Sequence, residues 1–136
     1  MGLAPPRSAA EHDVLLAARG IRKSFGHKQV LDGIDLELHH GEHLAIIGPS
    51  GGGKSTLIRC LNMLETPDDG ELIFEGKRIW NSAEAVKEST LRAHRIKVGM
   101  VFQSFNLFAT HTALQNVSLA QVHTLHRSRD EADQRS

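Results

Sequence analysis

The sequence predicts an α/β fold in which a buried strand ends in a glycine-rich loop and a helix follows the loop. The segment HLAIIG, residues 43–48, is apolar without alternation, which is typical of a strand buried on both faces of a parallel sheet. It runs directly into GPSGGGKST, residues 48–56. Beyond the glycines, apolar residues recur at helical spacing at Leu57, Ile58, Leu61 and Leu64. Strand, glycine loop and helix therefore follow one another in order.

The chain before this strand is expected to form two half-exposed strands that pair in antiparallel fashion. Residues 1–12 include two prolines and no long apolar run, and we expect a disordered leader there. VLLAARGIRKSFG, residues 14–26, begins apolar, becomes mixed and ends at a glycine. In QVLDGIDLEL, residues 29–38, the apolar Ile34, Leu36 and Leu38 alternate with the acidic Asp35 and Glu37 at a period of two. Together these strands predict an antiparallel β-subdomain.

The chain after the glycine loop predicts further short elements. TPDDG, residues 66–70, supplies the proline and glycine that end the helix, and ELIFEGKRIW, residues 71–80, has the pattern of a hairpin. VGMVFQ, residues 98–103, is a second apolar strand without alternation. Three more segments are expected to be a polar loop or helix, a helix and the start of another helix: residues 82–95, 110–126 and 127–136.

Composition excludes several classes of protein. Lys plus Arg equal Asp plus Glu at 16 each, so no net charge draws the chain to nucleic acid or to an anionic membrane. Cys60 is the only cysteine, which excludes an internal disulfide and fits a reducing compartment. The sequence has no apolar run long enough to span a bilayer and no signal-peptide core. Its nine histidines lack metal-ligand spacing and are interpreted as surface residues.

The glycine loop matches the phosphate-binding pattern Gly48-x-x-x-x-Gly53-Lys54-Ser55. Glycines permit positive φ, so that successive backbone N–H groups can surround a phosphate, and the following helix adds its positive end. Lys54 would reach the β- and γ-phosphates of a nucleotide, and the Ser55 hydroxyl would ligate Mg²⁺. The alternative is a flexible glycine turn. The expected ATP-binding residues of the loop are Gly48, Pro49, Ser50, Gly51, Gly52, Gly53, Lys54, Ser55 and Thr56.

Three strings extend the match beyond the loop. GPSGGGKSTLIRCLNMLETPDDGEL, then VGMVFQSFNLF, then TALQNV resemble the ATP-binding subunits of ABC transporters, most closely the polar amino acid uptake type that imports glutamine, histidine or arginine. The likeness runs from about Val14 to the last residue. It implies the ABC ATPase form of the P-loop NTPase fold: a β-subdomain and P-loop core over 13–103, and the start of a helical subdomain over 104–136.

The resemblance also implies roles for individual residues. Phe25 stands where the family places an aromatic that stacks on adenine, and Val30 would line the same pocket; a core phenylalanine is the alternative for Phe25. Gln103 matches the Q-loop glutamine, a catalytic residue that contacts Mg²⁺ and the attacking water. A merely solvated glutamine is the alternative there. The implied Mg²⁺ ligands are therefore Ser55 and Gln103.

Partners follow from the same resemblance. It implies transmembrane permease subunits that contact the Q-loop region, a second ATP-binding subunit in a homodimer, and a substrate-binding protein reached indirectly. This places the chain peripherally at the cytoplasmic face of the inner membrane. The apolar residues Phe102, Phe105, Leu107 and Phe108 offer surface to a coupling helix, with some of them expected in the core. Departures from the family pattern cluster at this docking surface, at Ser104, Ala109, Thr110 and Gln115.

The family's second half should carry an LSGGQ-type signature, an aspartate and glutamate after an apolar strand, and a switch histidine, and none follows Gln103 in this sequence. Glu75 follows an apolar run but comes too early, and is interpreted as a solvated strand-end carboxylate. We therefore expect ATP binding with little or no hydrolysis, an unpaired sheet edge and marginal stability. Three functions stay open: a transporter ATPase subunit, another P-loop enzyme such as a small kinase, and a truncated nucleotide-binding fragment.

Overall fold

A computed structural model describes residues 13–104 and 106–136 of the chain. The leader expected over residues 1–12, and Phe105, lie outside the described residues. The chain divides into two compact units between Gly99 and Met100, and each is described by itself below.

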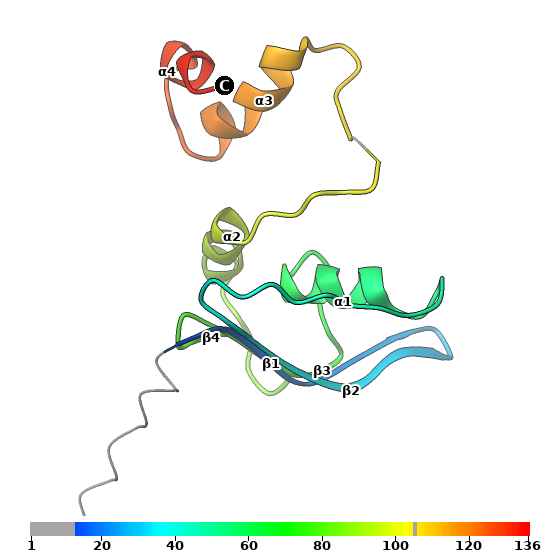
Figure 1. Ribbon diagram of the computed structural model, residues 1–136. Coiled ribbons are helices and arrows are strands. Elements are labelled where there is room, and N and C mark those ends of the chain that lie inside the picture. The colour runs from blue at the N-terminus through cyan, green and yellow to red at the C-terminus, as the bar shows by residue number, and fades with distance from the viewer. Residues whose placement is uncertain (1–12, 105) are drawn as a thin grey trace, which may run out of the picture. The chain divides into compact units, whose positions relative to one another are not determined.

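The first unit is built on an antiparallel sheet of four strands: β1 (Val14–Phe25), β2 (Lys28–His39), β3 (Asp69–Phe74) and β4 (Lys77–Asn81). Its strand order is β2-β1-β3-β4 (Figure 1). Both predicted hairpins are confirmed, because β1 pairs with β2 and β3 pairs with β4 in antiparallel fashion. In the first hairpin Phe25 is the register partner of Lys28 across a tight turn, so these two side chains meet at its tip.

Two helices complete the first unit. Helix α1 (Lys54–Leu61) lies over one face of the sheet, and α2 (Glu88–Lys97) precedes the end of the unit (Figure 1). The predicted helix after the glycine loop is thereby confirmed, and the segment 82–95, left open as loop or helix, holds most of α2, which continues to Lys97. The core joins apolar side chains of all four strands to α1 and the residues just after it: Leu16, Ala18, Ile21, Leu31, Leu57, Cys60, Met63, Leu72, Phe74, Ile79 and Trp80.

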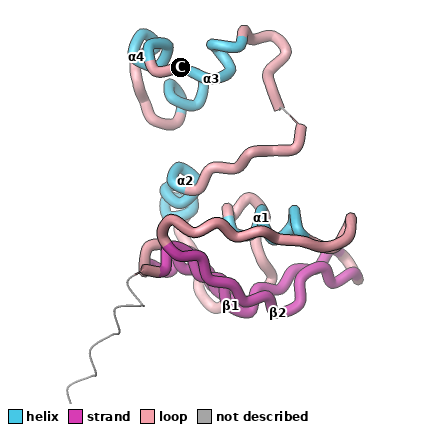
Figure 2. Tube along the Cα trace, in the orientation of Figure 1, coloured by secondary structure: helices cyan, strands magenta, loops and turns pink. Residues whose placement is uncertain are grey.

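The predictions of buried strands over 43–48 and 98–103 are wrong. Both segments are irregular, as the loop colouring in Figure 2 shows. Ile47 is 93% exposed and Val101 is 98% exposed. A strand inside a parallel sheet needs hydrogen-bonding neighbours, and within 13–104 and 106–136 neither segment has a paired strand. The apolar pattern of the two segments therefore predicted burial, but the described residues leave Ile47 and Val101 exposed.

His94 corrects the interpretation of all histidines as surface residues, because its side chain is only 2% exposed. Its Nε2 lies 2.8 Å from the Leu61 carbonyl oxygen at the end of α1, and its ring meets Phe74 edge-on at 5.2 Å between centroids. The carbonyls of a last helical turn lack partners within the helix, and a neutral imidazole can donate to one of them. His94 therefore docks α2 onto the end of α1.

Replacing His94 with alanine is expected to lower the free energy of unfolding by roughly 2–4 kcal/mol, because it leaves a cavity and an unpaired Leu61 carbonyl. The urea midpoint of the purified chain measures this loss. His43→Ala is the control, since His43 is exposed and should change stability by about 0.5 kcal/mol at most. A midpoint for His94→Ala equal to that of the control would refute the docking role.

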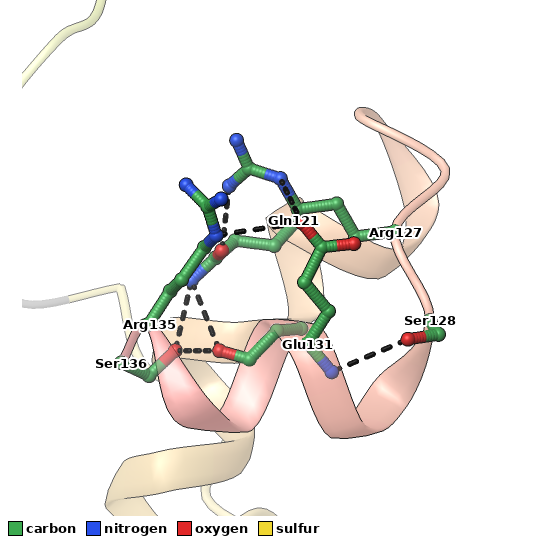
Figure 3. A network of polar contacts seen from close by, with 7 residues as sticks. Gln121, Arg127, Ser128, Glu131, Arg135 and Ser136 are labelled. Atoms are coloured by element: carbon green, nitrogen blue, oxygen red, sulfur yellow. Dashed lines mark hydrogen bonds and ion pairs between the residues drawn. The ribbon is translucent and has the colours of Figure 1, made fainter.

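The second unit contains α3 (Ala113–His123) and α4 (Arg129–Gln134), in the two regions where helices were predicted. A capping box starts α3, where Thr112 Oγ1 accepts from Gln115 N and Gln115 Oε1 accepts from Thr112 N. Figure 3 shows the polar network between the helices. Gln121 donates to Ser136 Oγ at 2.8 Å and accepts from Arg127 at 2.8 Å. These contacts hold the two helices together.

Candidate nucleotide-binding site

A cavity of about 290 Å³ lies where the β1–β2 hairpin meets the glycine loop. One wall comes from the hairpin and the other from the loop and the first turn of α1. The structure thus brings together most of the residues that were predicted from separate parts of the sequence. The lining residues are Phe25, Lys28, Val30, Gly51, Gly52, Gly53, Lys54, Ser55 and Thr56. Gly48, Pro49 and Ser50 belong to the loop but are not among them.

Gly53 sets how closely the loop approaches the sheet. Its φ is +86°, in the left-handed region, and it is the N-cap of α1. A Cβ at this position would stand 2.9 Å from the Val30 carbonyl oxygen and 3.1 Å from a Val30 side-chain carbon. Only glycine satisfies both the backbone angle and the contact. This contact explains why Val30 lies beside the loop.

Lys54 and the start of α1 supply the positive charge of the site. The Lys54 ammonium donates to the carbonyl oxygens of Gly48 at 2.8 Å and Pro49 at 2.6 Å, so the side chain lies folded over the loop. No side chain caps the N-terminus of α1, and Lys54, Ser55 and Thr56 of its first turn line the cavity. Uncapped N–H groups and the positive end of the helix dipole favour an anion at this wall.

Phe25 lines the cavity from the β1–β2 hairpin. Its side chain is 49% exposed, which excludes the alternative of a core phenylalanine. An exposed aromatic ring at the rim of a cavity can stack on a planar ligand. Lys28 lines the cavity as well and was missed in the sequence, although its register pairing with Phe25 follows from the tight hairpin turn after Phe25.

Gln103 belongs to the second unit, where it lies exposed in the irregular segment before α3. Its expected roles in catalysis and Mg²⁺ binding stay predictions. The neighbouring side chains Phe102, Leu107 and Phe108 are all exposed, so the expectation that some of this cluster is core is wrong for these three. Within residues 13–104 and 106–136, no group of three or more His, Cys, Asp or Glu side chains is arranged to hold a metal.

Glu75 follows β3 with a positive φ of 49°, and its carboxylate pairs with Lys97. The hydrogen bond from Lys97 holds the pKa of Glu75 below its usual value. Glu75 is thus an exposed, ion-paired turn residue, as the sequence predicted for a strand-end carboxylate.

The chain matches the family described as ABC transporter over residues 31–136. The chain belongs to the ABC transporter family. The resemblance stated from the three sequence strings is thereby confirmed, and so is an α/β fold of the ABC ATPase kind with an antiparallel β-subdomain.

Curated relatives of this ABC transporter chain are import proteins. It is 50% identical over 120 residues to "Probable amino-acid import ATP-binding protein YxeO" of Bacillus subtilis, covering 87% of this chain and 47% of the relative. It is 44% identical over 117 residues to "L-cystine import ATP-binding protein TcyC" of the same organism, covering 86% and 47%. The chain therefore spans about half the length of these two relatives.

Solved structures give the same family. The ATP-binding cassette MJ0796, determined as a post-hydrolysis dimer bound to ADP and Pi, matches with a TM-score of 0.74 and 29% identity, covering 89% of this chain and 53% of that one. The protein cbiO1 from Clostridium perfringens, part of the ABC transporter complex cbiONQ, matches with a TM-score of 0.72 and 28% identity, covering 90% and 47%. No helix within the described residues is long and apolar enough to cross a membrane.

Proposed function

We propose that this chain supplies the ATP-binding part of an amino acid import system. The observation that carries the proposal is the cavity in which Phe25 and Val30 face Gly53, Lys54 and Ser55. It places an aromatic platform at one end and a cationic, glycine-lined cradle at the other, which suits a base and its phosphates. The import relatives support amino acids as the transported class.

The residues at the cradle fit a Mg²⁺–nucleotide complex. The Lys54 ammonium would exchange the Gly48 and Pro49 carbonyls for phosphate oxygens, and the exposed Ser55 hydroxyl would hold Mg²⁺, with Gln103 as its second protein ligand. The metal would neutralise phosphate charge when bound. Gly48, Ser50, Gly51, Gly52 and Thr56 would contribute backbone N–H groups, whereas Pro49 has no backbone N–H and would only shape the loop.

Hydrolysis is expected to be weak in this chain alone. The reaction needs a group that orients water and stabilises charge on the γ-phosphate. Glu75 does not suit that task, because it is engaged with Lys97 in a turn after an antiparallel strand. Membership of the ABC transporter family sets aside the small-kinase alternative. Nucleotide binding without hydrolysis is the second candidate function, and it uses the same binding site.

The proposed partners are transmembrane permease subunits, which would contact the exposed apolar residues Phe102, Leu107 and Phe108. A second ATP-binding subunit would form a homodimer with this one, and a substrate-binding protein would act indirectly through the permease. The chain would then work as a peripheral subunit at the cytoplasmic face of the inner membrane.

Replacing Lys54 with alanine is expected to weaken binding of a fluorescent ATP analogue at least tenfold, because the main cationic contact to the phosphates is lost. Fluorescence anisotropy of the purified 136-residue chain with Mg²⁺ measures the affinity. Lys87→Ala is the matched control, since Lys87 is an exposed lysine at the start of α2 and removes the same charge. Equal binding by Lys54→Ala and the unaltered chain would defeat the proposed function.

A further inference from the structure

Lys23 is a nearly buried lysine on β1, two residues before Phe25. Its side chain is 12% exposed. Its ammonium lies 2.8 Å from the Glu65 carboxylate, 2.7 Å from the Thr66 carbonyl oxygen and 3.2 Å from the Asp68 carboxylate. An ammonium has three N–H donors, and three acceptors are in place here. Lys23 is therefore held in one position, unlike a typical surface lysine.

The same ammonium lies over the ring of Phe25, 5.3 Å from its centroid. This is the distance and placement of a cation–π contact. Lys23 is not among the residues that line the cavity, whereas Phe25 is. The cation therefore contacts the aromatic ring while leaving the cavity to Phe25, Lys28 and Val30.

The acceptors of Lys23 are themselves tied to β1. Asp68 Oδ2 accepts from the backbone N–H of Ser24 at 2.6 Å, and this bond is the main reason that the pKa of Asp68 lies below its usual value. The hydrogen bond to Glu65 is the main reason that the pKa of Lys23 is raised. Both groups are thus charged at neutral pH. The segment 65–68 is fastened to Lys23 and Ser24 of β1.

The contact with Lys23 restrains the orientation of the exposed Phe25 ring. An aromatic side chain that is half exposed at a hairpin tip samples several orientations, and fixing one of them on ligand binding costs conformational entropy. A cation fixed over the ring restrains it before the ligand arrives.

We propose that Lys23 is a positioning residue that fixes Phe25 as the stacking platform for the base of the bound nucleotide. The inference rests on the proposed function. The cluster of Lys23, Glu65 and Asp68 then contributes to the affinity for the base and does not contribute to the affinity for the phosphates.

The test compares two ligands, ATP and inorganic triphosphate, each competing with the fluorescent ATP analogue in the presence of Mg²⁺. Lys23→Met keeps the length of the side chain and removes its charge. It is expected to weaken ATP binding three- to tenfold and to leave triphosphate binding within twofold. A purely structural role for Lys23 would weaken both ligands alike, since a loosened segment 65–68 would disturb the end of α1.

Two further variants make the test decisive. Lys23→Arg keeps the cation over the ring and is expected to retain ATP affinity within twofold. In a chain carrying Phe25→Leu, Lys23→Met is expected to have no further effect on ATP, because Lys23 acts through the ring. Lys87→Met is the charge-matched control and is expected to change neither affinity. Glu65→Gln serves if Lys23→Met does not fold, and should give a smaller loss confined to ATP.

Unchanged ATP affinity in Lys23→Met, equal loss of both ligands, or additive losses with Phe25→Leu would each overturn the inference. These results differ from failure of the proposed function, in which the unaltered chain would bind neither ATP nor triphosphate.

Discussion

Replacing Gly53 with alanine is expected to lower the free energy of unfolding by roughly 3 kcal/mol and to abolish nucleotide binding. Alanine at a φ of +86° costs about 1–2 kcal/mol, and the close approach of its Cβ to the Val30 carbonyl adds a similar overpacking term. The loop and β2 would be forced apart, which separates the two walls of the cavity. Urea unfolding and binding of the fluorescent ATP analogue measure the two effects.

Gly51→Ala is the matched control for stability. Gly51 has a φ of +75°, close to that of Gly53, but a Cβ there would meet no atom within 4 Å. Its substitution therefore carries the backbone cost alone, about 1–2 kcal/mol. If Gly51→Ala and Gly53→Ala destabilise the chain equally, the contact with Val30 has no part in building the site.

Exchanging both Ile47 and Val101 for lysine is expected to keep the chain monomeric at micromolar concentrations where the unaltered chain self-associates. Both side chains are almost fully exposed in irregular apolar segments that pair with no strand in the described structure, which is the pattern that promotes intermolecular strand pairing. Light scattering after size exclusion measures the assembly state. The unaltered chain is expected to show a broad thermal transition with precipitation.

The control exchanges Ile58 and Val117 for lysine. Both are exposed apolar side chains, but they lie in α1 and α3, where helical hydrogen bonds already satisfy the backbone. Self-association should persist in this variant. A sharp, cooperative thermal transition of the purified, unaltered monomer would contradict the expectation.

The local sequence pattern was sufficient to predict elements whose hydrogen bonds join residues close together in the chain. The alternation within residues 29–38 and the glycine after Phe25 predicted the first hairpin. The apolar spacing beyond Gly53 predicted α1. Both predictions succeeded because the hairpin turn and the helix depend on residues a few positions apart. The segments 43–48 and 98–103 failed for the opposite reason. A buried strand exists only when neighbours occupy its edges, and no local pattern reports whether they are present.

The candidate site divides in the same way. The glycine motif predicted the loop residues and family resemblance predicted Phe25 and Val30, and the structure places Phe25, Val30 and residues 51–56 around one cavity. The sequence could not predict where the side chains of Lys23 and His94 lie. The partners of Lys23 are 42–45 residues away in the chain, and the partner of His94 is 33 residues away. A lysine or histidine in a sequence is usually exposed, and only the folded chain shows which one is enclosed.

The docking of α2 holds α1 at its C-terminal end. The first turn of α1 lines the cavity. At its other end, His94 contacts the Leu61 carbonyl oxygen. Just after the helix, Arg95 donates to the Met63 carbonyl and Asn62 donates to the Val98 carbonyl. The end of α1 that lies away from the cavity is therefore held by α2 and by Val98, the residue that follows α2.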